Sequence, residues 1–111
     1  MSPFQPQDPA FESRIRESFV RQKMMGLIGA ALTRVEPGRV EIELPFRDDL
    51  TQQHGFLHAG IVGTIADSAG GYAACTLMPA GSSVLSVEYK INLLAPADGE
   101  RLLASGQVVR P

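Results

Sequence analysis

The chain has 111 residues, which fits one domain, and its hydrophobic content of 44% is enough for a single packed core. Its formal net charge is −2 and its ten lysines and arginines are scattered, which excludes the basic patch that nucleic acid or an anionic membrane requires. We therefore expect one domain over residues 1–111, with neither nucleic acid nor membrane as a partner.

Cysteine content and the first residues indicate the compartment. Cys75 is the single cysteine, so no internal disulfide can form, and we expect it to be a small packing residue in a reducing cytoplasm. The first residues lack the basic start and apolar core of a signal peptide. Residues 58–78 are interrupted by glycine, threonine, serine and aspartate, so we do not expect them to span a lipid bilayer.

The N-terminal part of the chain predicts an irregular segment followed by a helix. Prolines at positions 3, 6 and 9 predict irregular structure over residues 1–9, where Asp8 can cap a helix that begins at Pro9. Apolar residues then recur at helical spacing with charged residues between them, which predicts an amphipathic helix over residues 10–25. These apolar residues are Phe11, Ile15 and Phe19.

A hairpin and a loop follow this helix. Residues 27–35 predict a strand, and Pro37 and Gly38 occupy the positions that a type II turn favours. The next strand has the clearest two-residue period in the chain, which predicts one buried and one exposed face. Its apolar residues are Val40, Ile42, Leu44 and Phe46. Residues 47–57 are polar and predict a loop.

Residues 58–78 predict the helix around which the domain is organised, and Asp67 is its one full charge. A helix that is apolar on all sides is expected to be buried. Helical spacing places Asp67 on a face of small residues, namely Gly60, Gly63, Thr64, Gly70, Gly71 and Ala74. Because glycine costs roughly 0.5–1 kcal/mol against alanine in a helix, this face should serve a close backbone approach or a ligand.

Two further strands are predicted after this helix. Alternation over residues 85–93 predicts a long strand, residues 95–99 a turn, and residues 100–110 another strand. The order of elements predicts an α+β domain with an antiparallel sheet curled around one helix. Because such a sheet has open edges, we expect it to pair with another copy.

Three pieces of the sequence together carry a resemblance to a known family. They are QQHGFLHAG at residues 52–60, Asp67 nine residues after His58, and SVEYKINLLAP at residues 86–96. Together they resemble the hotdog-fold acyl-CoA thioesterases of the phenylacetyl-CoA thioesterase (PaaI-like) family. The resemblance implies a hotdog fold, with an antiparallel sheet wrapped around a long central helix and active sites shared by two protomers. Members usually continue for two more strands, so it also implies that the last strands are lacking.

The resemblance implies roles for individual residues. Asp67 matches the catalytic carboxylate, and Ala59 and Gly60 occupy the helix-start positions whose backbone N–H groups polarise the thioester carbonyl. Gln52 lies where many members carry a water-positioning asparagine, and Ser86 lies near a strand serine that some members use. Two departures are the longer side chain at Gln52 and Ala59 in place of a second glycine.

The same chemistry follows from the residue types. The start of a helix has unsatisfied N–H groups and a favourable dipole for a carbonyl oxygen that gains charge. Asp67, about two turns into the helix, can act as general base or as nucleophile, and the sequence does not separate these roles. We expect His58, Gly55 and Ser86 to contact the substrate.

Three functions are open from the sequence. The first is an acyl-CoA thioesterase, a homodimer or homotetramer acting on a small aryl or medium-chain acyl-CoA. The second is a hotdog dehydratase or hydratase, which would use a loop histidine with the helix carboxylate, and the third is a non-catalytic acyl-thioester-binding module. The short Asp67 beside small residues favours the first, although a buried aspartate can also be purely structural. His54 and His58 have no companion ligand cluster, so no metal and no cofactor is expected.

Overall fold

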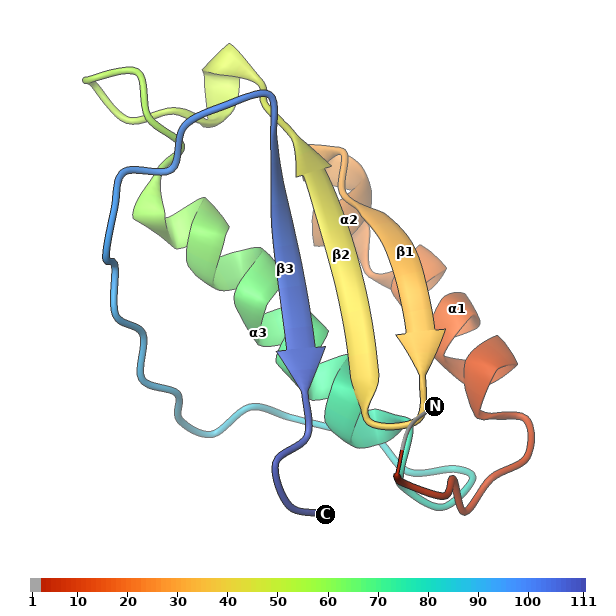
Figure 1. The fold of residues 1–111 in the computed structure, drawn as a ribbon. Helices are drawn as coiled ribbons and strands as arrows, with labels where there is room; N and C mark the ends of the chain where they lie inside the picture. The colour runs from red at the N-terminus through yellow and green to blue at the C-terminus, as the bar shows by residue number, and fades with distance from the viewer. Residues whose placement is uncertain (1–2) are drawn as a thin grey trace.

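The computed structural model describes residues 3–111 and contains a three-stranded antiparallel sheet with helices packed on one side (Figure 1). The elements in chain order are α1 (Phe11–Arg21), α2 (Lys23–Ile28), β1 (Ala31–Glu36), β2 (Arg39–Pro45), a 3-10 turn (Asp48–Leu50), α3 (Ala59–Cys75) and β3 (Arg101–Gln107). The strand order is β1-β2-β3. The long helix α3 packs against β2 and β3, and α1 packs against β1.

The N-terminal helix is broken where the sequence predicted continuity. α1 ends at Arg21, Gln22 adopts an extended conformation (φ −78°, ψ 99°), and α2 then begins. The predicted helix start is also wrong, because α1 begins at Phe11 after Ala10 and has no side-chain cap. Asp8 Oδ1 instead accepts a hydrogen bond of 2.9 Å from the Ala10 N–H, within the turn that precedes the helix.

The hairpin of β1 and β2 confirms the predicted turn. Val35 pairs with Val40, and Gly38 has φ +78°, the left-handed conformation that the second central position of a type II turn requires. The first strand starts later than predicted, at Ala31, because the residues up to Ile28 continue as α2. β2 keeps its predicted alternation, with all its inward side chains buried.

The hydrophobic core lies between the sheet and α3. Its largest contributions from β2 are Val40, Ile42 and Leu44, which are fully buried. α3 contributes Ile65, Ala69 and Ala73. The small side chains of α3 let the helix lie close to the sheet. This approach is closest at Gly106 of β3, where an added Cβ would lie 2.3 Å from the backbone oxygen of Ala69.

One chain buries only part of α3. Ala66 and Gly70 are exposed, as is the first turn at Ala59 and Gly60. The prediction of a helix enclosed on all sides is therefore wrong for a single chain, because the sheet covers only one face. No helix among residues 3–111 combines the length and hydropathy needed to cross a membrane.

The predicted strand over residues 85–93 is absent from the sheet. The segment is extended and runs alongside α3 (Figure 1), and within the described part of the chain residues 83–96 form no backbone–backbone hydrogen bond. β3 pairs with β2 only, so its other edge is open. The apolar side chains of the segment are exposed, namely Leu85, Val87, Tyr89, Ile91, Leu93 and Leu94. The alternating pattern gave the extended backbone correctly, but a strand also needs a partner edge.

The same segment lies against the glycine-rich face of α3. Val84 approaches within 3.7 Å of the position that a Cβ on Gly71 would occupy, and the Tyr89 hydroxyl within 3.3 Å of the corresponding position on Gly63. The neighbours at these two glycines are side-chain atoms, so the expected close backbone approach is not found there. A Cβ on Gly71 would make an ordinary van der Waals contact with Val84, whereas one on Gly63 would require the Tyr89 hydroxyl to shift by a few tenths of an ångström.

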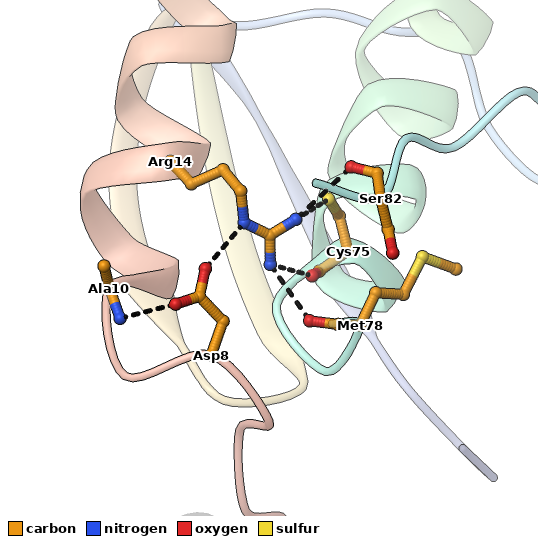
Figure 2. A network of polar contacts seen from close by, with 6 residues as sticks. All are labelled: Asp8, Ala10, Arg14, Cys75, Met78 and Ser82. Atoms are coloured by element: carbon orange, nitrogen blue, oxygen red, sulfur yellow. Dashed lines mark hydrogen bonds and ion pairs between the residues drawn. The ribbon is translucent and has the colours of Figure 1, made fainter. Parts of the chain in front are cut away.

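Arg14 ties the N-terminal region to the end of α3 (Figure 2). Its Nε forms an ion pair of 3.0 Å with Asp8, whose side chain is 10% exposed. Its Nη2 donates to the carbonyl oxygens of Cys75 and Met78 at 3.0 and 3.1 Å, and its Nη1 donates to the Cys75 sulfur at 3.2 Å. A longer contact of 3.5 Å reaches the Ser82 carbonyl. One guanidinium thus satisfies carbonyls that the end of a helix leaves without partners.

We expect Arg14→Met to lower the free energy of unfolding by about 2–4 kcal/mol, because it leaves a nearly buried carboxylate and several carbonyls unpaired. Urea unfolding followed by circular dichroism measures the change. Arg16→Met is the matched control, because Arg16 forms an exposed ion pair with Glu12 that should be worth less than about 1 kcal/mol. Equal losses from the two substitutions would show that the Arg14 contacts do not stabilise the fold.

Candidate functional site

Asp67 lies in the middle of α3 and is half-buried under the extended segment. Its carboxylate accepts a hydrogen bond of 2.5 Å from the Ser86 hydroxyl. Both residues line a cavity of about 640 Å³ between α1, α3 and the start of the segment. The other lining residues are Arg14, Ser18, Arg21, Gln22, Ser68, Gly71, Tyr72, Cys75, Ser82, Ser83, Val84 and Leu85. Asp67 and Ser86, which were predicted for the site in separate roles, are therefore brought together by contact between the segment and the helix.

A hydrogen-bond network forms one wall of this cavity. The Gln22 amide donates to the Tyr72 hydroxyl at 3.0 Å and accepts from the Ser68 hydroxyl at 3.1 Å. Ser18 shares a further hydrogen bond of 3.2 Å with Tyr72. These side chains join α1 to α3 beside Asp67. The sequence pattern did not reveal them, because Gln22 and Tyr72 lie 50 residues apart along the chain.

At the start of α3, the Gly60 N–H is hydrogen-bonded within the described part of the chain, whereas the Ala59 N–H is not. His58 is the N-cap residue, and its Nδ1 accepts from the Gly60 N–H at 2.8 Å. Its carbonyl accepts from the N–H of Ile61 at 2.9 Å. Among the described residues, no partner contacts the Ala59 N–H, and Ala59 is exposed. Of the two predicted donors, Ala59 is therefore the one whose N–H has no hydrogen-bond partner within residues 3–111.

Gln52 stabilises the loop that leads into α3. Its side-chain oxygen accepts from the backbone N–H groups of His54 and Phe56. Gly55 has φ +85° at the exposed turn of this loop, where its own N–H donates to the Gln52 carbonyl. The Gln52 side-chain oxygen therefore stabilises the loop conformation, and the side-chain nitrogen of Gln52 makes no hydrogen bond within residues 3–111.

An ion pair anchors the entry to this loop. Arg47 contacts Asp49 at 2.7 Å and also donates to the Leu27 carbonyl at 3.1 Å. The hydrogen bond from Arg47, together with its charge, holds the pKa of Asp49 below its ordinary value. The same hydrogen bond raises the pKa of Arg47. Both side chains are solvent-exposed, so the pair orders the entry to the loop without forming part of the core.

A second cavity of about 620 Å³ lies beside the start of α3. It is lined by Gln52 and Ala59 together with Phe56, Leu57, Val62, residues 92–98 and Leu102. The predicted site residues thus fall into two groups, with Asp67 and Ser86 in the first cavity and Gln52 and Ala59 in the second. At 1.5 Å of rise per residue, Ala59 and Asp67 are about 12 Å apart along the helix axis. A single chain does not bring them to one reacting atom.

No group of three or more His, Cys, Asp or Glu side chains in residues 3–111 is arranged to hold a metal ion. His58 is engaged at the helix start, and His54 lies exposed in the loop. Neither histidine lines the cavity that contains Asp67.

The chain is similar to a known protein family and to solved structures. The family model described as the thioesterase superfamily matches residues 54–110. A crystal structure of a thioesterase family protein from Silicibacter pomeroyi has 51% sequence identity and a TM-score of 0.89, over 91% of this chain and 74% of that one. The PaaI protein of the phenylacetic acid degradation operon of E. coli has 17% identity and a TM-score of 0.83, over 95% of this chain and 75% of that one. At that identity the similarity concerns the fold.

Two archaeal relatives are known by sequence. A proposed esterase from Saccharolobus solfataricus is 32% identical over 97 residues, which make up 86% of this chain and 69% of the relative. A proposed esterase from Halobacterium salinarum is 28% identical over 92 residues, which make up 78% of this chain and 60% of the relative. The chain thus spans about two thirds of the length of these relatives.

Proposed function

The chain belongs to the thioesterase superfamily of thioester hydrolases and has its hotdog fold, and on this basis we propose that it hydrolyses acyl-CoA thioesters with Asp67 as the activating carboxylate. The observation that carries the proposal is the position of Asp67, fixed by Ser86 at the wall of a cavity of about 640 Å³. That volume lies within the range of about 300–1,000 Å³ that small-molecule sites occupy.

In the proposed reaction, Asp67 removes a proton from water or attacks the thioester carbonyl itself. With Asp67 as base, the water oxygen forms the new C–O bond, the C–S bond breaks, and the leaving thiolate takes the proton that Asp67 removed. With Asp67 as nucleophile, the C–S bond breaks as a mixed anhydride forms, and water then hydrolyses the anhydride, which restores the carboxylate and supplies the proton of the thiol. The hydrogen bond from Ser86 holds one oxygen of Asp67 in place and leaves the other for the reaction. The Ala59 N–H stabilises the charge that develops on the carbonyl oxygen.

We further propose that this site is assembled from two copies of the chain. A carboxylate and an N–H donor that act on one carbonyl must each lie about 3 Å from the reacting group, whereas Ala59 and Asp67 of one chain are about 12 Å apart. A partner can supply the Ala59 N–H and the Gln52 loop to the Asp67 cavity. The open edge of β3 and the exposed apolar side chains of residues 85–94 support a homodimer or homotetramer.

A panel of thioesters tests the activity and its acyl preference. Release of free thiol from CoA esters of short, medium-chain and small aryl acids should be measured under the same conditions. We expect turnover of a small aryl or medium-chain acyl-CoA. Absence of turnover across the panel, with binding retained, would favour a non-catalytic acyl-thioester-binding module. Within residues 3–111 of one chain no histidine lines the Asp67 cavity, so a dehydratase would need a histidine from the loop of the second copy.

Mixing two inactive variants tests the shared site. Asp67→Asn removes the carboxylate, and Ala59→Pro removes only the N–H, because proline suits the first position of a helix and His58 (φ −59°, ψ 137°) has the conformation favoured before proline. Each variant alone should be nearly inactive. After denaturation and refolding together, the mixture should recover roughly a quarter of the wild-type rate, because half of randomly formed dimers are mixed and each mixed dimer has one intact site.

Melting curves of Ala59→Pro alone provide the folding control. A mixture no more active than its components would contradict the two-chain site, and full activity of Ala59→Pro would show that its N–H is not used. Light scattering on the wild-type chain gives an independent check, since a fully active monomer contradicts the same proposal.

A further inference from the structure

The cavity that contains Asp67 is lined by two arginines with different surroundings. Arg14 is fully engaged by Asp8 and by acceptors at the end of α3 (Figure 2). Arg21 makes no side-chain hydrogen bond or ion pair with any residue in the range 3–111, and it is exposed. Of the two arginines at the cavity wall, Arg21 is therefore the one without a polar partner in the part of the chain that the structure describes.

Arg21 is held at this wall by the break between α1 and α2. It is the last residue of α1, and the next residue, Gln22, is bonded through its side chain to Ser68 and Tyr72 of α3. Ser68 directly follows Asp67 in the sequence. Anchoring Gln22 to α3 thus places Arg21 on the same cavity as the reacting carboxylate, although no ion pair joins Arg21 to Asp67.

This separation of charges matters for catalysis. A salt bridge from Arg21 would occupy the oxygens of the Asp67 carboxylate and weaken it as a base or nucleophile. Because no ion pair joins the two side chains, Arg21 keeps five donors in a planar fork that matches a carboxylate or a phosphate. The Asp67 carboxylate would repel a free anion from this cavity. An anionic group that is covalently part of the thioester would instead enter together with the reacting carbonyl, because the whole substrate binds as one molecule.

We propose that Arg21 binds an anionic group of the thioester substrate. This inference rests on the proposed function and adds a substrate feature to it. Two parts of an acyl-CoA carry suitable chemistry, a carboxylate on the acyl chain and the phosphates of CoA, and both would pair with the guanidinium in the same way.

Binding of four thioether analogues, which cannot be hydrolysed, tests the proposal by titration calorimetry. The ligands combine a neutral or an ω-carboxylated acyl chain of equal length with either CoA or phosphate-free pantetheine. Arg21→Met removes the charge and keeps an apolar stem of similar reach. Arg16→Met removes an α1 charge that does not line the cavity, and is the matched control.

We expect Arg21→Met to raise the Kd at least about tenfold for ligands that carry the recognised anion, in line with a charge-assisted hydrogen bond. The neutral pantetheine ligand should change less than about twofold. A loss confined to both CoA ligands assigns the phosphates, and a loss confined to both carboxylated ligands assigns the acyl carboxylate. Arg21→Lys should restore part of the affinity, and Arg16→Met should change none.

Two outcomes would overturn the inference. One is unchanged affinity of Arg21→Met for all four ligands, and the other is an equal loss for all four, the neutral pantetheine ligand included. Because binding is measured without turnover, the result does not depend on hydrolysis. A protein that binds through Arg21 but releases no thiol from the corresponding esters would refute the thioesterase proposal and leave this inference standing.

Discussion

Replacing Asp67 with asparagine is expected to lower thioester turnover at least about a hundredfold, in line with loss of a general base. Asparagine has nearly the same shape and can still accept the hydrogen bond from Ser86, so the fold and the affinity for a thioether analogue should be retained. The measurements are the initial rate of thiol release, the Kd of the analogue and the melting temperature, all on the same preparation.

A purely structural Asp67 would give the opposite pattern. The variant would then melt earlier, while the folded fraction would keep its specific activity. Glu17→Gln is the matched control, because it removes an exposed carboxylate of α1 that forms no side-chain hydrogen bond or ion pair within residues 3–111. If Asp67→Asn binds, melts and turns over as the parent does, Asp67 is not the catalytic group.

Gly106→Ala is expected to lower the free energy of unfolding by about 3 kcal/mol, near the upper end of the usual cost of overpacking. The added Cβ would lie 2.3 Å from the Ala69 oxygen and 2.7 Å from the Gly70 nitrogen. Backbone atoms cannot move aside as a flexible side chain can. β3 must therefore shift away from α3, which opens the core. Chemical denaturation measures the loss.

The control comes from the helix side of the same contact. Nothing lies within 4 Å of the Cβ position on Gly70, so Gly70→Ala should raise stability by about 0.5–1 kcal/mol through helix propensity. The two substitutions add the same methyl group on adjacent backbones with opposite expected signs. Equal effects would show that the close approach of β3 to α3 does not limit stability.

The hairpin and the long helix were predictable because their signals are local. The alternation around Ile42 and the turn at Gly38 lie within a few residues of the structure that they specify. The break at Gln22 was not predictable, because it depends on Ser68 and Tyr72 far along the chain. For the same reason the alternation over residues 85–93 predicted an extended backbone correctly but could not supply a partner edge.

The candidate site shows the same division. The motif residues identified Asp67, Ser86 and the start of α3, and the spacing within one helix already fixes about 12 Å between Ala59 and Asp67. Arg21 was missed because nothing in its sequence surroundings distinguishes it from a solvated charge at a helix end. Its significance depends on the tertiary contact that sets the wall of the cavity.

The exposed segment over residues 85–94 could promote aggregation, and two charged residues within it oppose this tendency. A strand-like stretch with an apolar row and unpaired backbone groups is a template for uncontrolled stacking into aggregates. Between its apolar residues stand Glu88 and Lys90, which carry opposite charges at alternate positions. These charges disfavour parallel, in-register stacking of the segment from several copies, because Glu88 would then lie next to Glu88 and Lys90 next to Lys90. An antiparallel arrangement can instead set Glu88 of one copy opposite Lys90 of the other, so the charge pattern selects the direction in which two copies meet.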